Sequence, residues 1–203
     1  MGASAIPETA RRGRPLSERT ENAILEATAA LLDEKGLSEI TMEEIAATAG
    51  VGKASLYRRW PSKGTLAFDA FGARFLGRQP LVDTGSLRGD LTAALRAWLR
   101  TVHNTRTGRT LRGLIAEVQR DDALASAWNE RFLTPVRARH RVMIERAVAR
   151  GELPQDADSD LLLDLAYGPL YHRLLHGHRP LTVGFVDDVV ASVMAAGRAG
   201  RAG

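Results

Sequence analysis

A stretch of 23 residues, TMEEIAATAGVGKASLYRRWPSK at positions 41–63, limits what this chain can fold into more than any other feature. Its first part has apolar side chains at helical spacing, at Met42, Ile45, Ala46 and Ala49. Thr41 and Glu44 add a T-x-x-E pattern, which is typical of a capping box at a helix start. We therefore predict a short helix that begins after Thr41 and ends at the glycines.

The second part of this stretch predicts another short helix, over 53–59. Gly50 can adopt a positive φ where the chain reverses, and Val51 and Gly52 form the loop. Trp60 precedes Pro61, which biases Trp60 away from the helical conformation and stops the helix. Two short helices joined by a tight turn make a helix-turn-helix, which we place at 41–60.

The run GVGKAS within this stretch suggests a phosphate site of another kind, the P-loop of nucleotide-binding proteins. The spacing argues against it, because the position five before Gly52 is Ala47 and because Ala54 follows the lysine where a P-loop has Ser or Thr. A helix pattern also precedes the glycines, where a P-loop requires a strand. The phosphate is therefore predicted to belong to a nucleic-acid backbone.

Polar and basic side chains cover the outward side of the second helix. They offer donors for base edges and phosphates, as a recognition helix does, and they are Lys53, Ser55, Tyr57, Arg58 and Arg59. Pro61, Ser62 and Lys63 open a further helix, whose free N–H groups favour an anion. The alternative is a solvated basic face with no ligand.

Residues 18–78 resemble the DNA-binding domain of the tetracycline-repressor (TetR) family. The motif is carried by Thr41, Ile45, Ala46, Ala49, Gly50, Val51, Leu56, Tyr57, Trp60 in place of the usual Phe, Ser62 and Lys63. The chain departs from the pattern at Gly64 and Thr65, which predicts a weaker start of the fourth helix. The resemblance implies an all-α homodimer without a cofactor, in which one helix-turn-helix per subunit reads a double-stranded DNA operator and a larger helical domain binds a small-molecule effector.

The residues predicted to contact DNA come from the helix-turn-helix and from the N-terminal arm. They are Thr41, Lys53, Ala54, Ser55, Tyr57, Arg58, Trp60 and Lys63, together with Arg12 and Arg14. Residues 1–17 are predicted to form a flexible basic arm, whose Arg-Gly-Arg-Pro run could enter an A·T-rich minor groove. The alternative is a disordered tail without a specific contact.

The remaining sequence also reads as helical, which gives an all-α chain of about nine helices. The first helix should start near Ser17 and end before Gly36. Later helices are expected at 109–120, at 123–150 with a bend at Pro135, from Asp158 or Ser159 to His176 with a kink at Gly168-Pro169, and from Thr182 to about Ala196. We place the DNA-binding domain at 18–78 and a ligand-binding and dimerisation domain at 79–203.

The last two predicted helices carry apolar residues on more than one face, which suggests a partner subunit. The alternative is an internal helix pair, and the family resemblance favours the dimer. The predicted dimer interface comprises Leu163, Leu170, Leu174, Phe185, Val189 and Val193. The aromatic and polar residues that could line a small-molecule pocket are Phe68, Phe71, Phe75, Trp98, His103, Trp128, Phe132, Tyr167 and Tyr171, although for each of them ordinary core is the simpler interpretation.

Bulk properties restrict the class of protein further. The chain has 203 residues, no cysteine and a net charge of +4, which excludes disulfides and thiolate metal sites and suggests an anionic partner. Residues 1–64 hold nine basic and nine acidic side chains, so the N-terminal part is basic only locally. No apolar run suits a membrane span and the N-terminus lacks a signal-like core, so we expect a cytoplasmic protein.

Two other functions remain open from the sequence. An all-α metal enzyme could use His172, His176 and His178, but the H-E-x-x-H glutamate is absent, so we expect neither a metal nor catalysis. A transcriptional activator of the same fold would have the same sequence features, because activation depends on where the operator lies relative to the promoter.

Overall fold

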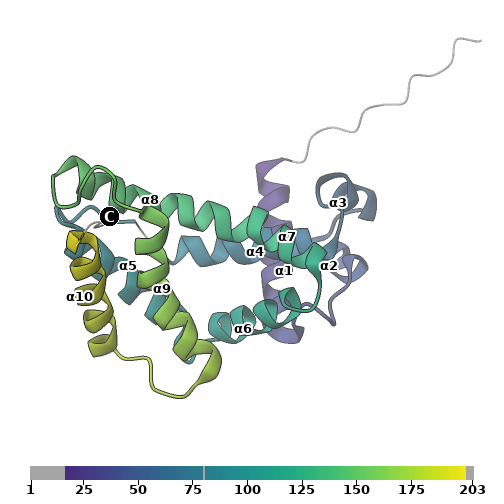
Figure 1. Cartoon of the computed structure of the whole chain (residues 1–203). Helices are drawn as coiled ribbons and strands as arrows, with labels where there is room; N and C mark the ends of the chain where they lie inside the picture. Colours follow the sequence, from purple (N-terminus) through teal and green to yellow (C-terminus); the bar gives the residue numbers. More distant parts are fainter. Residues whose placement is uncertain (1–16, 80, 200–203) are drawn as a thin grey trace, which may run out of the picture.

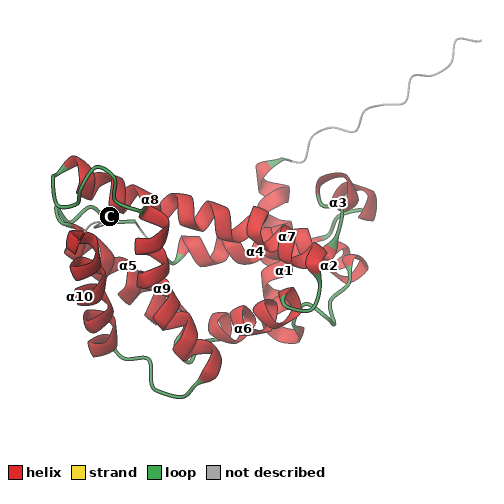
Figure 2. Ribbon diagram, in the orientation of Figure 1, coloured by secondary structure: helices red, strands yellow, loops and turns green. Residues whose placement is uncertain are grey.

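The computed structural model describes residues 17–79 and 81–199, and within them the chain consists of helices and loops (Figures 1 and 2). The helices are α1 (Glu18–Lys35), α2 (Met42–Ala49), α3 (Lys53–Arg59), α4 (Lys63–Gly77), α5 (Leu87–Val102), α6 (Arg106–Val118), α7 (Asp122–Trp128), α8 (Thr134–Ala149), α9 (Ser159–His176) and α10 (Val183–Ala199), with a π-helical segment, η1 (Asn129–Leu133), between α7 and α8. The all-α prediction is confirmed.

Polar side chains fix where most of these helices begin, as the sequence indicated at Thr41 and Asp158, whereas the helix expected at 109–120 begins earlier, after Thr105. A hydroxyl or carboxylate accepts a hydrogen bond from a backbone N–H of the first turn at Ser17, Thr41, Ser62, Ser86, Thr105, Asp121 and Asp158. The predicted capping box at Thr41 is half formed, because the Glu44 carboxylate instead accepts from Lys35. At Ser62 both halves are formed with Thr65, so the start of α4 is not weakened as predicted.

The helix expected at 123–150 is one continuous path made of α7, η1 and α8. Counted as one helix, it gives the predicted total of nine within the described residues. Pro135 has no N–H and its ring crowds the carbonyl four residues before it, at Arg131. The wider π-helical turn over Asn129–Leu133 lies directly before this position, which is how the path continues past the proline.

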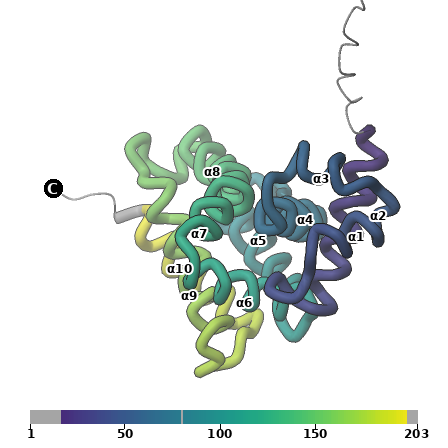
Figure 3. The backbone as a smooth tube through the Cα atoms, turned by 90° about the vertical axis from the view of Figure 1, so that its right-hand side faces the viewer, coloured from purple at the N-terminus to yellow at the C-terminus, as the bar shows by residue number. Residues whose placement is uncertain are grey.

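Helix α4 joins the N-terminal helices to the α7–η1 segment. It packs against α1 on one side and against α7 and η1 on another, while α10 packs against α5 and α9 (Figure 3). Gly64, in its first turn, fits against α7 because a Cβ there would lie 2.6 Å from Cδ2 of Leu124. One hydrophobic cluster runs from Ile24 in α1 to Met194 in α10, so the core is continuous across the domain boundary predicted at 78/79.

The two ends of the molecule carry different elements. Helices α2 and α3 lie at one end, and α9 and α10 lie at the other, with α4 and α8 spanning the distance between them (Figure 1). Within the described residues, none of the helices combines the length and the apolar character that crossing a bilayer requires.

The α5–α6 corner yields a test of the packing. A Cβ at Gly108 would lie 1.9 Å from the backbone oxygen of Val102, whereas a Cβ at Gly113 in the same helix would meet nothing within 4 Å. Gly108→Ala should therefore lower the free energy of unfolding by about 1–3 kcal/mol through overpacking. Gly113→Ala is the matched control and should raise it by up to about 1 kcal/mol. Urea unfolding followed by circular dichroism measures both; equal effects would contradict the close approach.

Candidate nucleic-acid face and internal cavity

The predicted helix-turn-helix is formed by α2 and α3. Gly50 ends α2 in the left-handed region at φ 67°, and the N–H of Val51 donates to the carbonyl of Ala46. Leu56 of α3 is fully buried against the core, which fixes the rotation of this helix about its axis. The opposite side of α3 is therefore turned to solvent.

The solvent side of α3 carries the predicted contact residues. Lys53, Ala54, Tyr57 and Arg58 are exposed, Tyr57 to 49%, and Ser55 is partly buried. Nζ of Lys53 lies 3.0 Å from the Glu43 carboxylate, and its hydrogen bond is the main reason that the pKa of Glu43 lies below its ordinary value. This face offers an ammonium, a guanidinium and two hydroxyl groups on one rigid helix, a donor set suited to phosphates and base edges.

Two of the predicted contact residues are placed differently. Trp60 is 1% exposed, and its Nε1 donates to Oδ2 of Asp69 at 2.8 Å, so its side chain is part of the core and cannot touch DNA. Nζ of Lys63 donates to the carbonyls of Ser38 and Ile40, both at 3.1 Å. Lys63 therefore holds the α1–α2 loop, and at most one of its three N–H groups remains for a phosphate.

The remaining predicted DNA contacts are Thr41 and two arginines of the N-terminal arm. Thr41 is exposed next to this face, where its oxygen accepts from the N–H of Glu44 and its hydroxyl hydrogen stays available. Arg12 and Arg14 lie outside the described residues.

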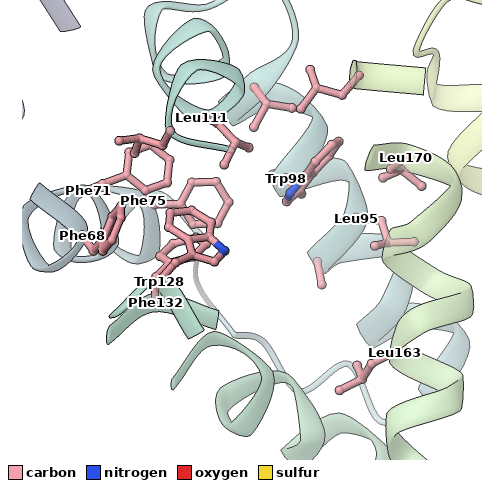
Figure 4. Close-up of a cluster of buried hydrophobic side chains, with 14 of the residues drawn as sticks. Phe68, Phe71, Phe75, Leu95, Trp98, Leu111, Trp128, Phe132, Leu163 and Leu170 are labelled. Carbon is pink, nitrogen blue, oxygen red and sulfur yellow. The ribbon is translucent and has the colours of Figure 1, made fainter. Parts of the chain in front are cut away.

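A cavity of about 410 Å³ lies among α4–α9. Its wall is mostly apolar and aromatic, and it comprises Phe75, Trp98, Ile115, Trp128, Leu133, Val136, Arg137, His140, Leu163, Asp164, Tyr167, Gly168, Tyr171 and Leu175. In Figure 4, Trp128 and Phe75 face Trp98 across an open space, and Leu163 of α9 lies on a further side. The volume is in the range of small-molecule sites.

Five of the nine predicted pocket residues line this cavity: Phe75, Trp98, Trp128, Tyr167 and Tyr171. Phe68, Phe71 and Phe132 lie behind the wall, in an aromatic block with Phe75 and Trp128 whose neighbouring ring centroids are 4.2–6.2 Å apart. His103 is exposed and contacts Asn104, so its assignment to the pocket is wrong.

Several wall residues were missed from the sequence. Leu163, a predicted dimer residue, lines the wall, and so does His140, which is not among the predicted site residues. His140 is 3% exposed and stands at helical spacing from Val136 and Ile144, so the apolar stripe of α8 could have revealed it. Arg137 and Asp164 could not have been paired, because they are 27 positions apart and meet only in the fold.

The polar groups inside the cavity are held neutral by burial. Burial lowers the pKa of His140 to about 4, with a smaller contribution from Arg139, while a hydrogen bond to the Val136 backbone opposes the shift. Burial also raises the pKa of Tyr167 far above its ordinary value and that of Tyr171 to about 12. At neutral pH these three groups are therefore an imidazole and two phenols.

Charged groups meet at the edge of the cavity. Arg137 donates to the carboxylates of Asp160 and Asp164, and Arg141 donates to Asp160 at 2.8 Å. The hydrogen bonds from both arginines hold the pKa of Asp160 below its ordinary value. Two positive and two negative charges thus balance one another and tie α8 to α9.

A carboxylate connects the cavity wall to the helix-turn-helix. Oδ2 of Asp69 in α4 accepts from Nε1 of Trp60, which follows α3 directly, and lies 3.4 Å from Nη1 of Arg131 in η1. Trp128 and Leu133, which flank Arg131 along the chain, both line the cavity. The residue that follows α3, the first half of α4 and the segment between two wall residues therefore meet at one carboxylate.

The predicted dimer residues lie mostly inside the single chain. Leu163, Leu170, Leu174, Val189 and Val193 are at most 7% exposed, so they form core and cannot dock a partner. Phe185 is partly buried under the guanidinium of Arg173, which lies 3.2 Å from its ring centroid. The apolar side chains that α9 does expose are Leu161, Leu165 and Leu175, and α10 exposes Val183.

The three histidines considered for a metal site pack on one another. The His172 ring centroid lies 4.7 Å from that of His176 and 4.8 Å from that of His178. Across residues 17–79 and 81–199, no group of three or more His, Cys, Asp or Glu side chains is arranged to hold a metal ion.

Comparisons with known proteins agree with this geometry. Residues 24–70 match the family model described as "Bacterial regulatory proteins, tetR family", and residues 81–193 match the "Tetracyclin repressor-like, C-terminal domain". The HTH-type transcriptional regulator YdeS of Bacillus subtilis is 35% identical over 89% of this chain and 90% of its own length.

Two further relatives cover the chain to a similar extent. The DNA-binding transcriptional repressor TetR of Mycobacteroides abscessus is 32% identical over 87% of this chain and 93% of its own. The crystal structure of the TetR family transcription regulator SCO0332 is 34% identical and superposes with a TM-score of 0.79, covering 88% of this chain and 98% of that one. The likeness thus spans both the helix-turn-helix and the cavity.

Burial of His140 predicts how stability depends on pH. The pKa of His140 is about 4 in the folded chain and 6.5 for the free side chain. Between about pH 6.5 and about pH 4 the unfolded chain therefore binds more protons than the folded chain, so the free energy of unfolding falls as the pH falls. From about pH 7 to about pH 5 this loss amounts to about 2 kcal/mol. Urea unfolding at both pH values measures this loss. On going from about pH 7 to about pH 5, His140→Gln should lose about 2 kcal/mol less stability than the wild type. Equal losses in the two proteins would contradict a neutral buried imidazole.

Proposed function

The chain belongs to the TetR family of DNA-binding transcriptional regulators, and we propose that it is a ligand-responsive repressor that binds a palindromic operator as a homodimer. The single observation that carries the proposal is the exposed donor face of α3, held by a buried Leu56 and connected through Asp69 to the wall of a cavity. The name of the Mycobacteroides abscessus relative favours a repressor over an activator.

We assign the reading of DNA to the solvent side of α3. Lys53, Ser55 and Arg58 are proposed to meet base edges and phosphates, and Tyr57 to donate to the backbone. Thr41 and Ala54 lie beside them and are proposed as contacts at the edges of this face. Lys63 acts mainly by holding the α1–α2 loop against α4, and Trp60 acts by fixing the end of α3 from inside.

We assign the homodimer to the outer faces of α9 and α10. Leu161 and Leu165 stand one turn apart on α9 and are 50% and 38% exposed, and Val183 of α10 is 50% exposed. Ala191 and Ala195 are exposed further along α10, where small side chains allow close approach of a partner helix. This surface lies at the far end of the chain from α3, so a partner that docks there leaves both recognition helices uncovered (Figure 1).

The cavity is proposed as the effector site, and the contact at Asp69 as the route by which an effector acts. A ligand that displaces Trp128 or Leu133 moves η1, and with it Arg131. The Asp69 carboxylate transmits this movement to Trp60 and hence to the end of α3. Linkage requires that operator binding weaken ligand binding by the same factor, and such coupling is typically about 1–3 kcal/mol.

Substitutions on α3 test the DNA-reading face. Lys53→Ala should weaken operator binding by about 1–3 kcal/mol and change the preferred bases, whereas Tyr57→Phe should weaken binding to all sequences alike through a lost phosphate contact. Arg88→Ala removes the same charge in the first turn of α5, outside the helix-turn-helix, and is the control. Selection from a random-sequence DNA library, followed by titrations at several salt concentrations, measures these effects. A library that returns no inverted repeat would refute the operator proposal.

A charge on the outer face of α9 tests the homodimer. Leu165→Asp should give a folded monomer that binds operator poorly, because each half-site alone offers few contacts. Val82→Asp is the matched control, since Val82 is equally exposed at 38% but lies in the α4–α5 loop. Light scattering gives the mass of each variant, and a Leu165→Asp protein that keeps the wild-type mass would place the interface elsewhere.

The contact at Asp69 can be tested by a double-mutant cycle without a ligand. Val136 lines the cavity next to η1, so Val136→Phe should fill part of it and weaken operator binding as an effector does. Asp69→Asn keeps an acceptor for Trp60 but removes the charge that pairs with Arg131. Fluorescence anisotropy should show a loss of about 1–3 kcal/mol for Val136→Phe alone and less than about half of it in the Asp69→Asn background. An equal loss in both backgrounds would contradict the route.

A further inference from the structure

The cavity contains hydrogen-bond donors that the protein itself does not satisfy. Among the described residues, neither the hydroxyl of Tyr167 nor Nε1 of Trp98 has a hydrogen-bond partner of ordinary geometry, and both atoms are buried. Nε1 of Trp98 is near enough to the Tyr171 hydroxyl to oppose the rise that burial causes in the pKa of Tyr171, but it does not reach hydrogen-bond geometry there. Buried donors without partners are unfavourable, so an acceptor brought by a ligand would be bound strongly here.

The same cavity offers nothing to neutralise a charged ligand. Arg137, the cation on its wall, is already bound to Asp160 and Asp164. His140 is uncharged at neutral pH because burial keeps its pKa at about 4. Taking a carboxylate out of water into such a site is costly, since no unpaired cation would receive it.

The remaining wall favours flat rings. Phe75, Trp98, Trp128, Tyr167 and Tyr171 contribute aromatic surfaces from four different helices, and Ile115, Leu133, Val136 and Leu163 fill the spaces between them. Aromatic side chains bind ring-shaped ligands by stacking and edge contacts. The cavity of about 410 Å³ suits a molecule of two or three rings.

We infer that the ligand of this cavity is a neutral, ring-containing molecule that carries a hydrogen-bond acceptor such as a ketone oxygen, bound by the Tyr167 hydroxyl and the Trp98 indole N–H. This inference rests on the proposed function for its regulatory meaning, but the chemistry of the site is independent of it. It separates this chain from regulators whose effectors are anions.

Four compounds of one skeleton test the class of ligand. Xanthone is a neutral three-ring ketone, and xanthene has a methylene group in place of the carbonyl. Xanthone-2-carboxamide and xanthone-2-carboxylate match each other in size and differ in charge. Calorimetric titration of the full chain without DNA should show that xanthone binds at least about tenfold more tightly than xanthene, which is the effect of about one hydrogen bond between neutral groups. The carboxamide should likewise bind at least about tenfold more tightly than the carboxylate, which is the effect of one unpaired charge.

Substitution of the two donors assigns the contact. In Tyr167→Phe/Trp98→Phe the ratio of xanthone to xanthene affinity should fall to near one, while Leu175→Ala, which alters the wall without removing a donor, should leave the ratio unchanged. Tyr167→Phe alone should unfold at the same or a higher temperature than the wild type, because a buried hydroxyl without a partner is removed. The inference would be overturned if Tyr167→Phe unfolded at a lower temperature than the wild type or if xanthone did not bind. It would also be overturned if the carboxylate bound more tightly than the carboxamide, or if the double variant kept the wild-type ratio.

Operator binding, measured separately, distinguishes the two proposals. If xanthone binds with the expected dependence on its ketone but leaves operator affinity unchanged, the ligand class stands and the proposed regulation falls. If the carboxylate binds tighter and releases the operator, the regulation stands and the ligand class falls.

Discussion

The carboxylate of Asp69 is the contact on which the arrangement of the rest of the molecule depends. It accepts the indole N–H of Trp60 and faces the guanidinium of Arg131, so α3, α4 and η1 meet at one atom. Trp60 itself is buried, which means that the end of the recognition helix is held from inside rather than by surface contacts. Any change in the position of η1 must then be shared with α3 or break this contact.

Close packing between α4 and the α7–η1 segment allows a movement of one to reach the other. Phe71, Phe75, Trp128 and Phe132 form an aromatic block whose rings lie 4.2–6.2 Å apart where they meet, and this block joins α4 to α7 and η1. Protein interiors packed to this extent transmit displacement because they hold few voids that could absorb it. The cavity is the exception, and two of its wall residues, Phe75 and Trp128, belong to the block. A ligand that fills the cavity therefore acts on the block directly.

Local signals predicted much of this structure, and contacts between distant residues account for what they missed. The caps at Ser17, Thr41 and Asp158 and the glycine turn at Gly50 depend on neighbours within four positions, so the sequence displays them. The Asp69–Arg131 pair is separated by 62 positions, and no local pattern announces it. The same reason explains why the sequence predicts a phosphate contact for Lys63, although its ammonium binds two carbonyls of the α1–α2 loop.

The faces of α9 were the hardest part to predict. A helix that is apolar on two faces can bury both in the core or offer one to a partner, and periodicity does not say which residues belong to which face. Leu163 and Leu174 proved to be core, while Leu161 and Leu165 are outside. The composition of the cavity was likewise only partly predictable, because aromatic residues that line a space and aromatic residues that fill it have the same spacing in the sequence.

The most direct test of the account measures the distance between the two recognition helices in the proposed dimer. The chain has no cysteine, so Ala54→Cys on the exposed face of α3 accepts a single spin label per subunit. Pulsed electron resonance without DNA should show that Val136→Phe changes the distance between the two labels by at least about 2 Å, which is the scale of helix shifts in regulatory proteins. When Asp69→Asn is added to Val136→Phe, this change should disappear. A shift of the same size in both backgrounds, or none in either while Val136→Phe still weakens operator binding, would contradict the role of Asp69.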